Sequence, residues 1–226
     1  MVAKLVEQVC DARRGFTYEQ VARRELPFDW ELIDGRIIAR GRIGYWHRSI
    51  RESLVNGLER TRRAPYAMFA DRCLLAGESN ATRPDIVVVD ESRADTYATE
   101  YLPTAAAVLV VEIVSTVTQS DDWFRKPQLY AAAGIANFWR VERSEDDRPI
   151  VYQYWLDHES ASYVPAPANV HTGTLTTAVP YPVRIDLSGA RICAPPLGGD
   201  SARLAYRTGG ARSMRSHRRC PECGRG

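Results

Sequence analysis

The sequence predicts an α/β protein with a mixed sheet and helices packed against it. Three features indicate this class. Two runs rich in β-branched residues, 84–90 and 108–114, have the continuous apolar pattern of strands that are covered on both faces. Apolar residues recur at helical spacing over 46–62, and Asp34-Gly35 separates two short apolar runs, which is a strong hairpin signal.

The remaining elements are predicted in chain order. Thr17 can cap a short helix that continues to Arg24. A third helix over 120–133 ends at Gly134; Pro127 either opens its regular part or kinks a looser first turn. Further strands are predicted over 30–33, 36–39, 66–75, 136–142 and 150–156, around residue 163, and over 183–187.

Length and composition indicate one globular domain followed by a basic tail. The chain has 226 residues, of which 45% are hydrophobic and 26% are charged, so collagen-like and wholly disordered classes are excluded. Gly, Ser and Arg dominate the C-terminal part, which predicts a folded domain over 1–197 and a disordered tail over 198–226. Cys220 and Cys223 resemble half a zinc site, and we expect no zinc there unless two chains share it.

The sequence also indicates the cellular compartment of the protein. The longest apolar stretch, 105–111, is far shorter than the ~20 residues of a membrane span. Residues 1–11 are charged and lack the apolar centre of a secretory signal. The five cysteines are an odd number, which argues against a disulfide framework. We therefore expect a cytoplasmic protein without membrane contact.

Two carboxylates and one lysine are the candidate chemical groups. Asp85 opens the first buried run and Glu112 lies inside the second, where a carboxylate is costly unless it is paired or bound to a metal. Two such groups on neighbouring strands would repel each other unless a divalent cation lay between them. Lys126 stands out because it and Lys4 are the only lysines among 30 basic residues. Carboxylates that hold Mg²⁺, with a lysine that stabilises negative charge, form the centre of a metal-dependent phosphodiesterase.

Five short segments occur in a characteristic order. They are ELIDG at 31–35, RPDIVV at 83–88, VVEIVS at 110–115, KPQLYAAAGI at 126–135 and FWRV at 138–141. In this order and spacing they resemble the bacterial putative restriction endonuclease family of the PD-(D/E)XK nuclease superfamily, over about residues 15–190. The resemblance implies a restriction-endonuclease-like core (αβββαβ) with peripheral strands, and a magnesium site in which Mn²⁺ can substitute.

The resemblance also implies roles for individual residues. Asp85, Glu112 and the backbone carbonyl of Ile113 would ligate the metal. The superfamily pattern has its lysine at the position of Val114, and Lys126 on the following helix would take that role here. Glu31 would be an accessory acid near the metal.

Two other side chains have simpler interpretations. His47, at the start of the long helix, is an accessory candidate that could contact a phosphate or the metal. Tyr130 lies on an apolar helix face and is interpreted as a packing residue.

The predicted function is therefore cleavage of nucleic acid, with DNA as the expected substrate. A homodimer is a candidate assembly, because cutting both strands of a duplex needs two sites. Val114 keeps open an alternative, a nucleic-acid-binding protein on the same fold that has lost cleavage. A small-molecule enzyme is disfavoured, since the chain has neither a Gly-rich phosphate loop nor a nucleophile elbow.

Overall fold

A six-stranded mixed sheet is the scaffold of the protein. The structure is a computed structural model that describes residues 15–96, 98–114 and 121–188, so the predicted tail lies outside the described residues. β8 and β9 run parallel, and all other neighbours in this sheet are antiparallel. The strands are, in spatial order, β11 (Ser162–His171), β10 (Pro149–Asp157), β9 (Asn137–Arg143), β8 (Ala107–Ile113), β6 (Ile86–Asp90) and β3 (Tyr66–Ala70).

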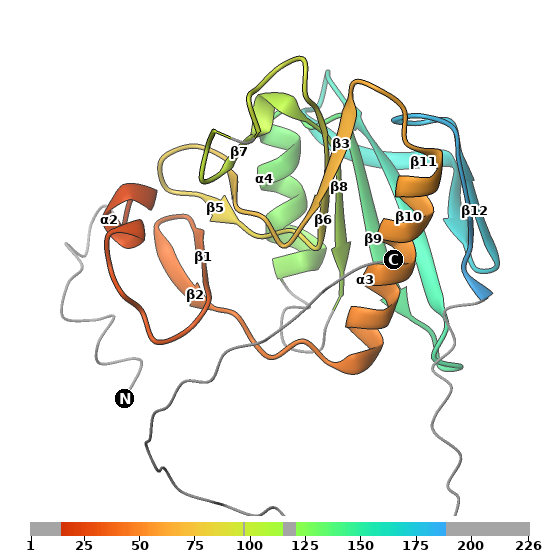
Figure 1. Cartoon of the computed structure of the whole chain (residues 1–226), viewed down its shortest axis with the longest axis horizontal. Coiled ribbons are helices and arrows are strands. Elements are labelled where there is room, and N and C mark those ends of the chain that lie inside the picture. Colours follow the sequence, from red (N-terminus) through yellow and green to blue (C-terminus); the bar gives the residue numbers. More distant parts are fainter. Residues whose placement is uncertain (1–14, 97, 115–120, 189–226) are drawn as a thin grey trace, which may run out of the picture. The chain divides into compact units, whose positions relative to one another are not determined.

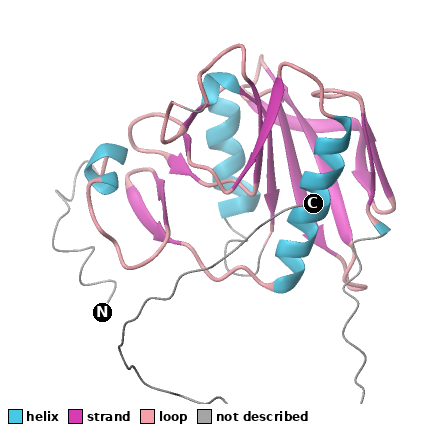
Figure 2. Cartoon of the chain, viewed as in Figure 1, coloured by secondary structure: helices cyan, strands magenta, loops and turns pink. Residues whose placement is uncertain are grey.

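Different helices cover the two faces of this sheet (Figure 1). Ile86 and Val88 of β6 pack on the side of α3 (Tyr45–Thr61), whereas Val87 and Val89 pack on the side of α4 (Lys126–Ala132). Successive side chains of a strand point to opposite faces, so a strand covered on both sides must be apolar at every position. The two helices and the strands between them can be followed in Figure 2.

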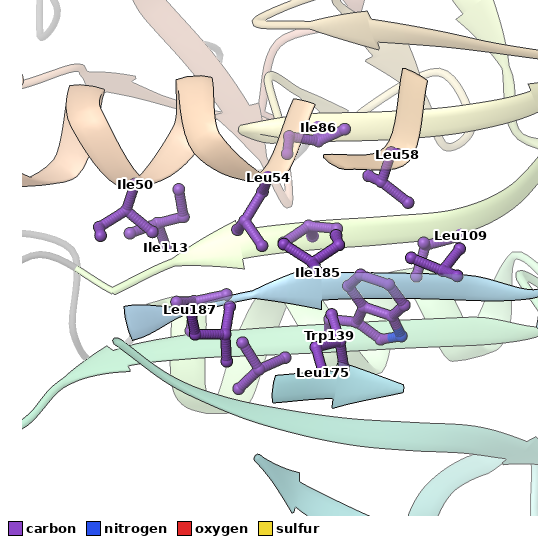
Figure 3. Close-up of a cluster of buried hydrophobic side chains, with 14 of the residues drawn as sticks. Ile50, Leu54, Leu58, Ile86, Leu109, Ile113, Trp139, Leu175, Ile185 and Leu187 are labelled. Carbon is purple, nitrogen blue, oxygen red and sulfur yellow. The ribbon is translucent and has the colours of Figure 1, made fainter. Parts of the chain in front are cut away.

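α3 packs on the sheet through a single apolar face. Ile50, Leu54 and Leu58 are spaced by four residues and are buried, as expected for one stripe of an amphipathic helix. Figure 3 shows these side chains against those of the sheet, including Ile113 and Trp139. This contact fixes the start of α3 beside the end of β8.

A small hairpin completes the same layer. It consists of β12 (Thr174–Thr177) and β13 (Val183–Asp186), which pair antiparallel. Ile185 of this hairpin lies so close to Gly57 of α3 that a Cβ at residue 57 would be 2.6 Å from Ile185 Cγ1. Glycine at this position permits the close approach of helix and hairpin.

A second sheet of short strands lies at the N-terminal side of the chain. Asp34 and Gly35 form the predicted hairpin turn, with φ values of 52° and 71°, since a two-residue hairpin turn of this kind needs positive φ at both positions. The short helix α2 (Tyr18–Ala22) begins after Thr17, whose side chain caps it as predicted. The strands are, in spatial order, β2 (Arg36–Ala39), β1 (Trp30–Ile33), β5 (Ala81–Thr82), β4 (Leu74–Leu75) and β7 (Leu102–Pro103).

The element order confirms the predicted α/β class with a mixed sheet. Once the strands of the second sheet are set aside, α3, β3, β6, β8, α4 and β9 follow one another in the order αβββαβ. The single strand predicted over 66–75 is wrong, because β3 ends at Ala70 and Asp71 adopts a φ of 56°. Pro127 lies in the first turn of α4, after a wider π-helical turn over Asp121–Arg125. Within the described ranges, no helix is both long and apolar enough to cross a membrane.

Candidate active site

All six residues predicted for the site line one cleft. The cleft has a volume of about 340 Å³ and lies between the segment after β2, the start of α3, the start of α4 and the adjacent ends of β6 and β8. Four of the six side chains are charged and almost fully buried, each being at most 4% exposed. Buried charges of this kind need close partners. The six residues are Glu31, His47, Asp85, Glu112, Ile113 and Lys126.

Asp85 and Glu112 lie opposite each other on neighbouring antiparallel strands. Ile86 pairs with Val111, so the residue before the first lies opposite the residue after the second. Asp85 Oδ2 accepts a hydrogen bond of 2.7 Å from the backbone amide of Ile113. The backbone of Ile113 therefore borders the cleft, while its side chain packs in the core.

Glu112 is approached by two side chains from α4. The Tyr130 hydroxyl donates a hydrogen bond of 2.6 Å to Glu112 Oε1. The Lys126 ammonium lies 3.4 Å from Glu112 Oε1 and 3.5 Å from Oε2. Residues four apart on a helix share a face, which is why Lys126 and Tyr130 reach the same carboxylate.

Glu31 contacts the same ammonium from the second sheet. Its Oε2 lies 3.1 Å from Lys126 Nζ. Its Oε1 accepts a hydrogen bond of 2.6 Å from the backbone amide of Arg83. Lys126 therefore lies between two carboxylates that come from different sheets.

An ion pair next to Lys126 joins α4 to the β1–β2 hairpin. The Arg125 guanidinium donates to both carboxylate oxygens of Asp34, with an Nε–Oδ2 distance of 2.6 Å. Hydrogen bonding to Arg125 is the main cause of a lowered pKa at Asp34. The turn that bears Asp34 is itself anchored, because Asn80 Oδ1 accepts from the Asp34 amide at 2.8 Å. These bonds hold the start of α4 near the strand that carries Glu31.

His47 contacts the second oxygen of Asp85. Its Nε2 lies 3.2 Å from Asp85 Oδ1. Its Nδ1 is buried and has no hydrogen-bond partner among the described residues. Since buried polar atoms are nearly always satisfied, we expect a water or a ligand to bind this nitrogen.

Tyr130 is the main residue of the site that the sequence interpretation missed. Its ring packs as predicted, 6.1 Å from that of Phe138, but its hydroxyl takes part in the charged cluster. Burial, and then the neighbouring charge of Glu112, raise the pKa of Tyr130 well above its usual value. The hydroxyl therefore remains a proton donor at neutral pH. Its distance of four residues from Lys126 is the sequence signal that could have identified it.

The donor set fits a magnesium-type cation. Glu31, Asp85 and Glu112 bring three formal negative charges and Lys126 one positive charge, an excess of two negative charges in a buried cluster. A divalent cation would balance this excess. In the described part of the chain, however, no three His, Cys, Asp or Glu side chains are grouped so that all of them could hold one metal ion. Side chains would therefore supply only part of the ligand set. The remaining ligands would be the Ile113 carbonyl and water, which Mg²⁺ accepts readily.

Arginines surround this acidic centre. Arg40, Arg42, Arg83 and Arg143 also line the cleft, and we call them the basic rim. Arg40 is paired with Asp71, and Arg143 with Asp147. The side chains of Arg42 and Arg83 make no ion pair with any other described residue. The cleft therefore combines carboxylates at its centre with guanidinium groups that can bind phosphates.

Comparisons with known proteins found a matching family model and a solved structure of similar fold. A family model described as "Putative restriction endonuclease" (Uma2) matches residues 17–179. The structure is similar to the crystal structure of a putative nuclease from Anabaena variabilis, with a TM-score of 0.54 and 19% sequence identity over 72% of this chain and 87% of that chain. At this identity the likeness shows a shared fold. Comparison with curated proteins found no match.

Proposed function

The chain belongs to the Uma2 family of putative restriction endonucleases, and on this premise we propose that it is a divalent-metal-dependent endonuclease that hydrolyses phosphodiester bonds of DNA. The observation that carries the proposal is the position of Lys126, whose ammonium lies 3.4 Å from Glu112 in the cleft that also contains Asp85. A lysine beside a carboxylate pair is an arrangement that supports metal-dependent phosphodiester hydrolysis, because the carboxylates can hold the metal and the ammonium can stabilise developing negative charge. Here the lysine comes from a helix, while Val114 occupies its expected place in the strand.

We assign the metal to Asp85, Glu112 and the carbonyl of Ile113. Mg²⁺ held by these groups would polarise the phosphate and lower the pKa of a bound water. The chain keeps both carboxylates in place by hydrogen bonds, since Asp85 accepts from Ile113 and Glu112 accepts from Tyr130. Each carboxylate oxygen has two lone pairs, so these bonds leave acceptor capacity for a cation.

Lys126 is the residue we expect to act on the reacting phosphate. Its positive charge would stabilise the negative charge that develops on the non-bridging oxygens as water attacks phosphorus. The attacking water forms the new P–O bond and loses a proton to solvent, while the bond to the leaving oxygen breaks and that oxygen takes up a proton from solvent. Glu31, 3.1 Å from the ammonium, would keep Lys126 charged and oriented during this step. His47 would hold Asp85 through the contact at its Oδ1.

The basic rim supports DNA as the substrate. Arg42 and Arg83 line the cleft beside the acidic centre, where they can pair with the phosphates that flank the one to be cut. Because the described part of the chain contains one such centre, we expect two chains to act together on a duplex.

A second candidate function has one observation in its favour. Val114 lines the cleft at the position where the superfamily pattern has its lysine, which is what a protein that binds DNA without cutting it would show. A single experiment can distinguish the two candidate functions.

The experiment is nicking of a supercoiled plasmid by the full chain with Mg²⁺ or Mn²⁺. We expect nicking by the wild type and by Glu59→Gln, which changes an exposed ion pair on α3. We expect none by Glu112→Gln or Lys126→Met. Binding of the plasmid by the wild type without cleavage at any metal concentration would favour the second candidate. Equal cleavage by the wild type and Glu112→Gln would overturn the assigned metal site.

A further inference from the structure

Tyr130 has a polar contact that packing alone does not explain. The residue is fully buried, and its ring lies against Phe138 between α4 and the sheet. A phenylalanine would fill the same space. The hydroxyl instead lies 2.6 Å from Glu112 Oε1 and 3.1 Å from Oγ1 of Thr82, which is also fully buried.

The proton count of these three groups gives the contact a direction. A tyrosine hydroxyl has one proton, and an ionised carboxylate can only accept. The bond of 2.6 Å to Glu112 therefore takes the Tyr130 proton. The Thr82 hydroxyl can then direct its own proton at the Tyr130 oxygen, which strengthens the donor.

The two side chains that reach Glu112 from α4 differ in stiffness. Lys126 has a long flexible side chain, and its ammonium lies at 3.4 Å and 3.5 Å from the two oxygens. Tyr130 has two rotatable bonds, both fixed by the packing of its ring, and forms the shorter contact. The hydroxyl therefore fixes how the Glu112 carboxylate is rotated, whereas the ammonium mainly neutralises its charge.

We propose that Tyr130 is a positioning residue that orients the Glu112 carboxylate for a divalent cation, with Thr82 as its support. This inference rests on the proposed function, because it takes Glu112 to be a metal ligand. Partners that hold a ligating carboxylate typically change metal affinity by about 10- to 100-fold when they are removed. The role is distinct from the chemical step, since Tyr130 acts through Glu112 and is not among the residues that line the cleft.

The test is a titration of the full chain with Mn²⁺, in which electron paramagnetic resonance measures the concentration of the free ion. We expect Tyr130→Phe to weaken Mn²⁺ binding about 10- to 100-fold. Thr82→Val should weaken it less, and Thr82→Ser, which keeps the hydroxyl, should restore it. Tyr181→Phe is the matched control, because that buried hydroxyl donates to the Leu58 carbonyl at 3.3 Å and does not line the cleft.

A second readout separates positioning from a general loss of structure. The Mg²⁺ concentration for half-maximal nicking should rise in Tyr130→Phe, while the rate at saturating Mg²⁺ should recover to near the wild-type value. Mn²⁺ binding by Tyr130→Phe equal to that of the wild type, with Glu112→Gln defective, would overturn the positioning role and leave the proposed function intact. An equal loss in Tyr181→Phe would also overturn it. If the wild type itself binds no Mn²⁺, the proposed function fails, and the inference fails with it.

Discussion

Lys126 joins two carboxylates that belong to different sheets, with its Nζ 3.1 Å from Glu31 Oε2 and 3.4 Å from Glu112 Oε1. Glu31 lies on β1 of the second sheet, and Glu112 lies on β8 of the main sheet. The buried ammonium group of Lys126 thus stabilises the junction of the two sheets as well as the centre of the cleft. Substitutions at Lys126 and at Glu31 should therefore affect stability and cleavage to different extents.

Replacing Lys126 with Met should abolish cleavage and destabilise the metal-free protein. Loss of one group that stabilises transition-state charge typically costs 10²–10³-fold in rate, so we expect at least about 100-fold. Removing one member of a buried ion pair costs about 3–5 kcal/mol. In the variant the buried carboxylates lack their ammonium partner, and a cation bound to the native state restores stability. Mn²⁺ should therefore raise the melting temperature more in the variant than in the wild type. Calorimetry with and without Mn²⁺ measures this, and equal shifts would contradict it.

Glu31→Gln should slow cleavage and weaken the metal site only slightly. The amide oxygen of Gln can still accept from the Arg83 amide, but it no longer attracts the Lys126 ammonium. We expect a loss of about tenfold at saturating Mg²⁺, or about 1.4 kcal/mol in the barrier. Mn²⁺ affinity should be only slightly below that of the Glu59→Gln control, because Glu31 adds negative charge to the cluster but is not assigned as a ligand. Parallel nicking and Mn²⁺ titrations check this, and a large fall in Mn²⁺ affinity would instead make Glu31 a metal ligand.

The basic rim should determine how DNA binding depends on salt. In the Glu112→Gln background, which keeps substrate intact, Arg42→Gln or Arg83→Gln should weaken duplex binding. Each should reduce the slope of log affinity against log salt by about 1, because each removes one phosphate contact. Arg60→Gln, at the far end of α3, is the control. Slopes that match the control would show that DNA does not enter this cleft.

Asp34→Asn should remove a small, pH-dependent contribution to stability. The pKa of Asp34 is lowered below its usual 3.8, chiefly by hydrogen bonds from Arg125. The contribution is therefore complete above that value and is lost as pH falls through the lowered pKa. The side chain is 47% exposed, so we expect less than about 1 kcal/mol at neutral pH.

Urea unfolding of Asp34→Asn and of the wild type between pH 7 and pH 3 measures this contribution. Asn also tolerates positive φ, so the turn should be kept and the comparison should report the charge alone. The difference between the two proteins should be constant near neutral pH and shrink below about pH 4. A difference that grew on acidification would contradict the assignment.

Gly57→Ala should destabilise the fold although Ala is the better helix former. The added methyl would lie 2.6 Å from Ile185 Cγ1, and overpacking of this kind costs about 1–3 kcal/mol. The helix-propensity gain of about 1 kcal/mol would offset part of this cost. Asn56→Ala, at the exposed neighbouring position, should be neutral or stabilising. Chemical denaturation of both variants measures their free energies of unfolding. A stabilised Gly57→Ala would show that β13 can move away from α3.

Much of the fold follows from local sequence pattern, because the pattern has one solution where both faces are buried. The prediction of strands over 84–90 and 108–114 is confirmed by β6 and β8, and Asp34-Gly35 forms the expected hairpin turn. The two-residue strands β5 and β7 have no counterpart among the predicted strands, and β4 was predicted only as the end of one strand over 66–75. Their pairing depends on contacts between segments far apart in the chain, which no local pattern expresses.

The residue types of the site were predicted, while the contacts among them were not. Asp85, Glu112 and Lys126 are unusual in their sequence surroundings, so the sequence alone is enough to single them out. The partnership of Tyr130 with Glu112 requires knowledge of which side chain faces which strand. Thr82 carries no sequence signal at all, since its role depends on a strand of two residues that places its hydroxyl beside a helix.

The helical origin of the lysine has a consequence for how such proteins diverge. If Lys126, which follows Glu112 by 14 residues, is the catalytic lysine as proposed, the end of β8 does not have to supply a cation. Val114 can then serve the sheet alone, and its amide donates to the Val141 carbonyl at 2.8 Å. A search for the strand motif of the superfamily alone would pass over this centre, whereas a search by three-dimensional arrangement of two acids and an amine would find it. Relatives that lack the strand lysine are therefore candidates for re-examination at the helix that follows their acidic strand.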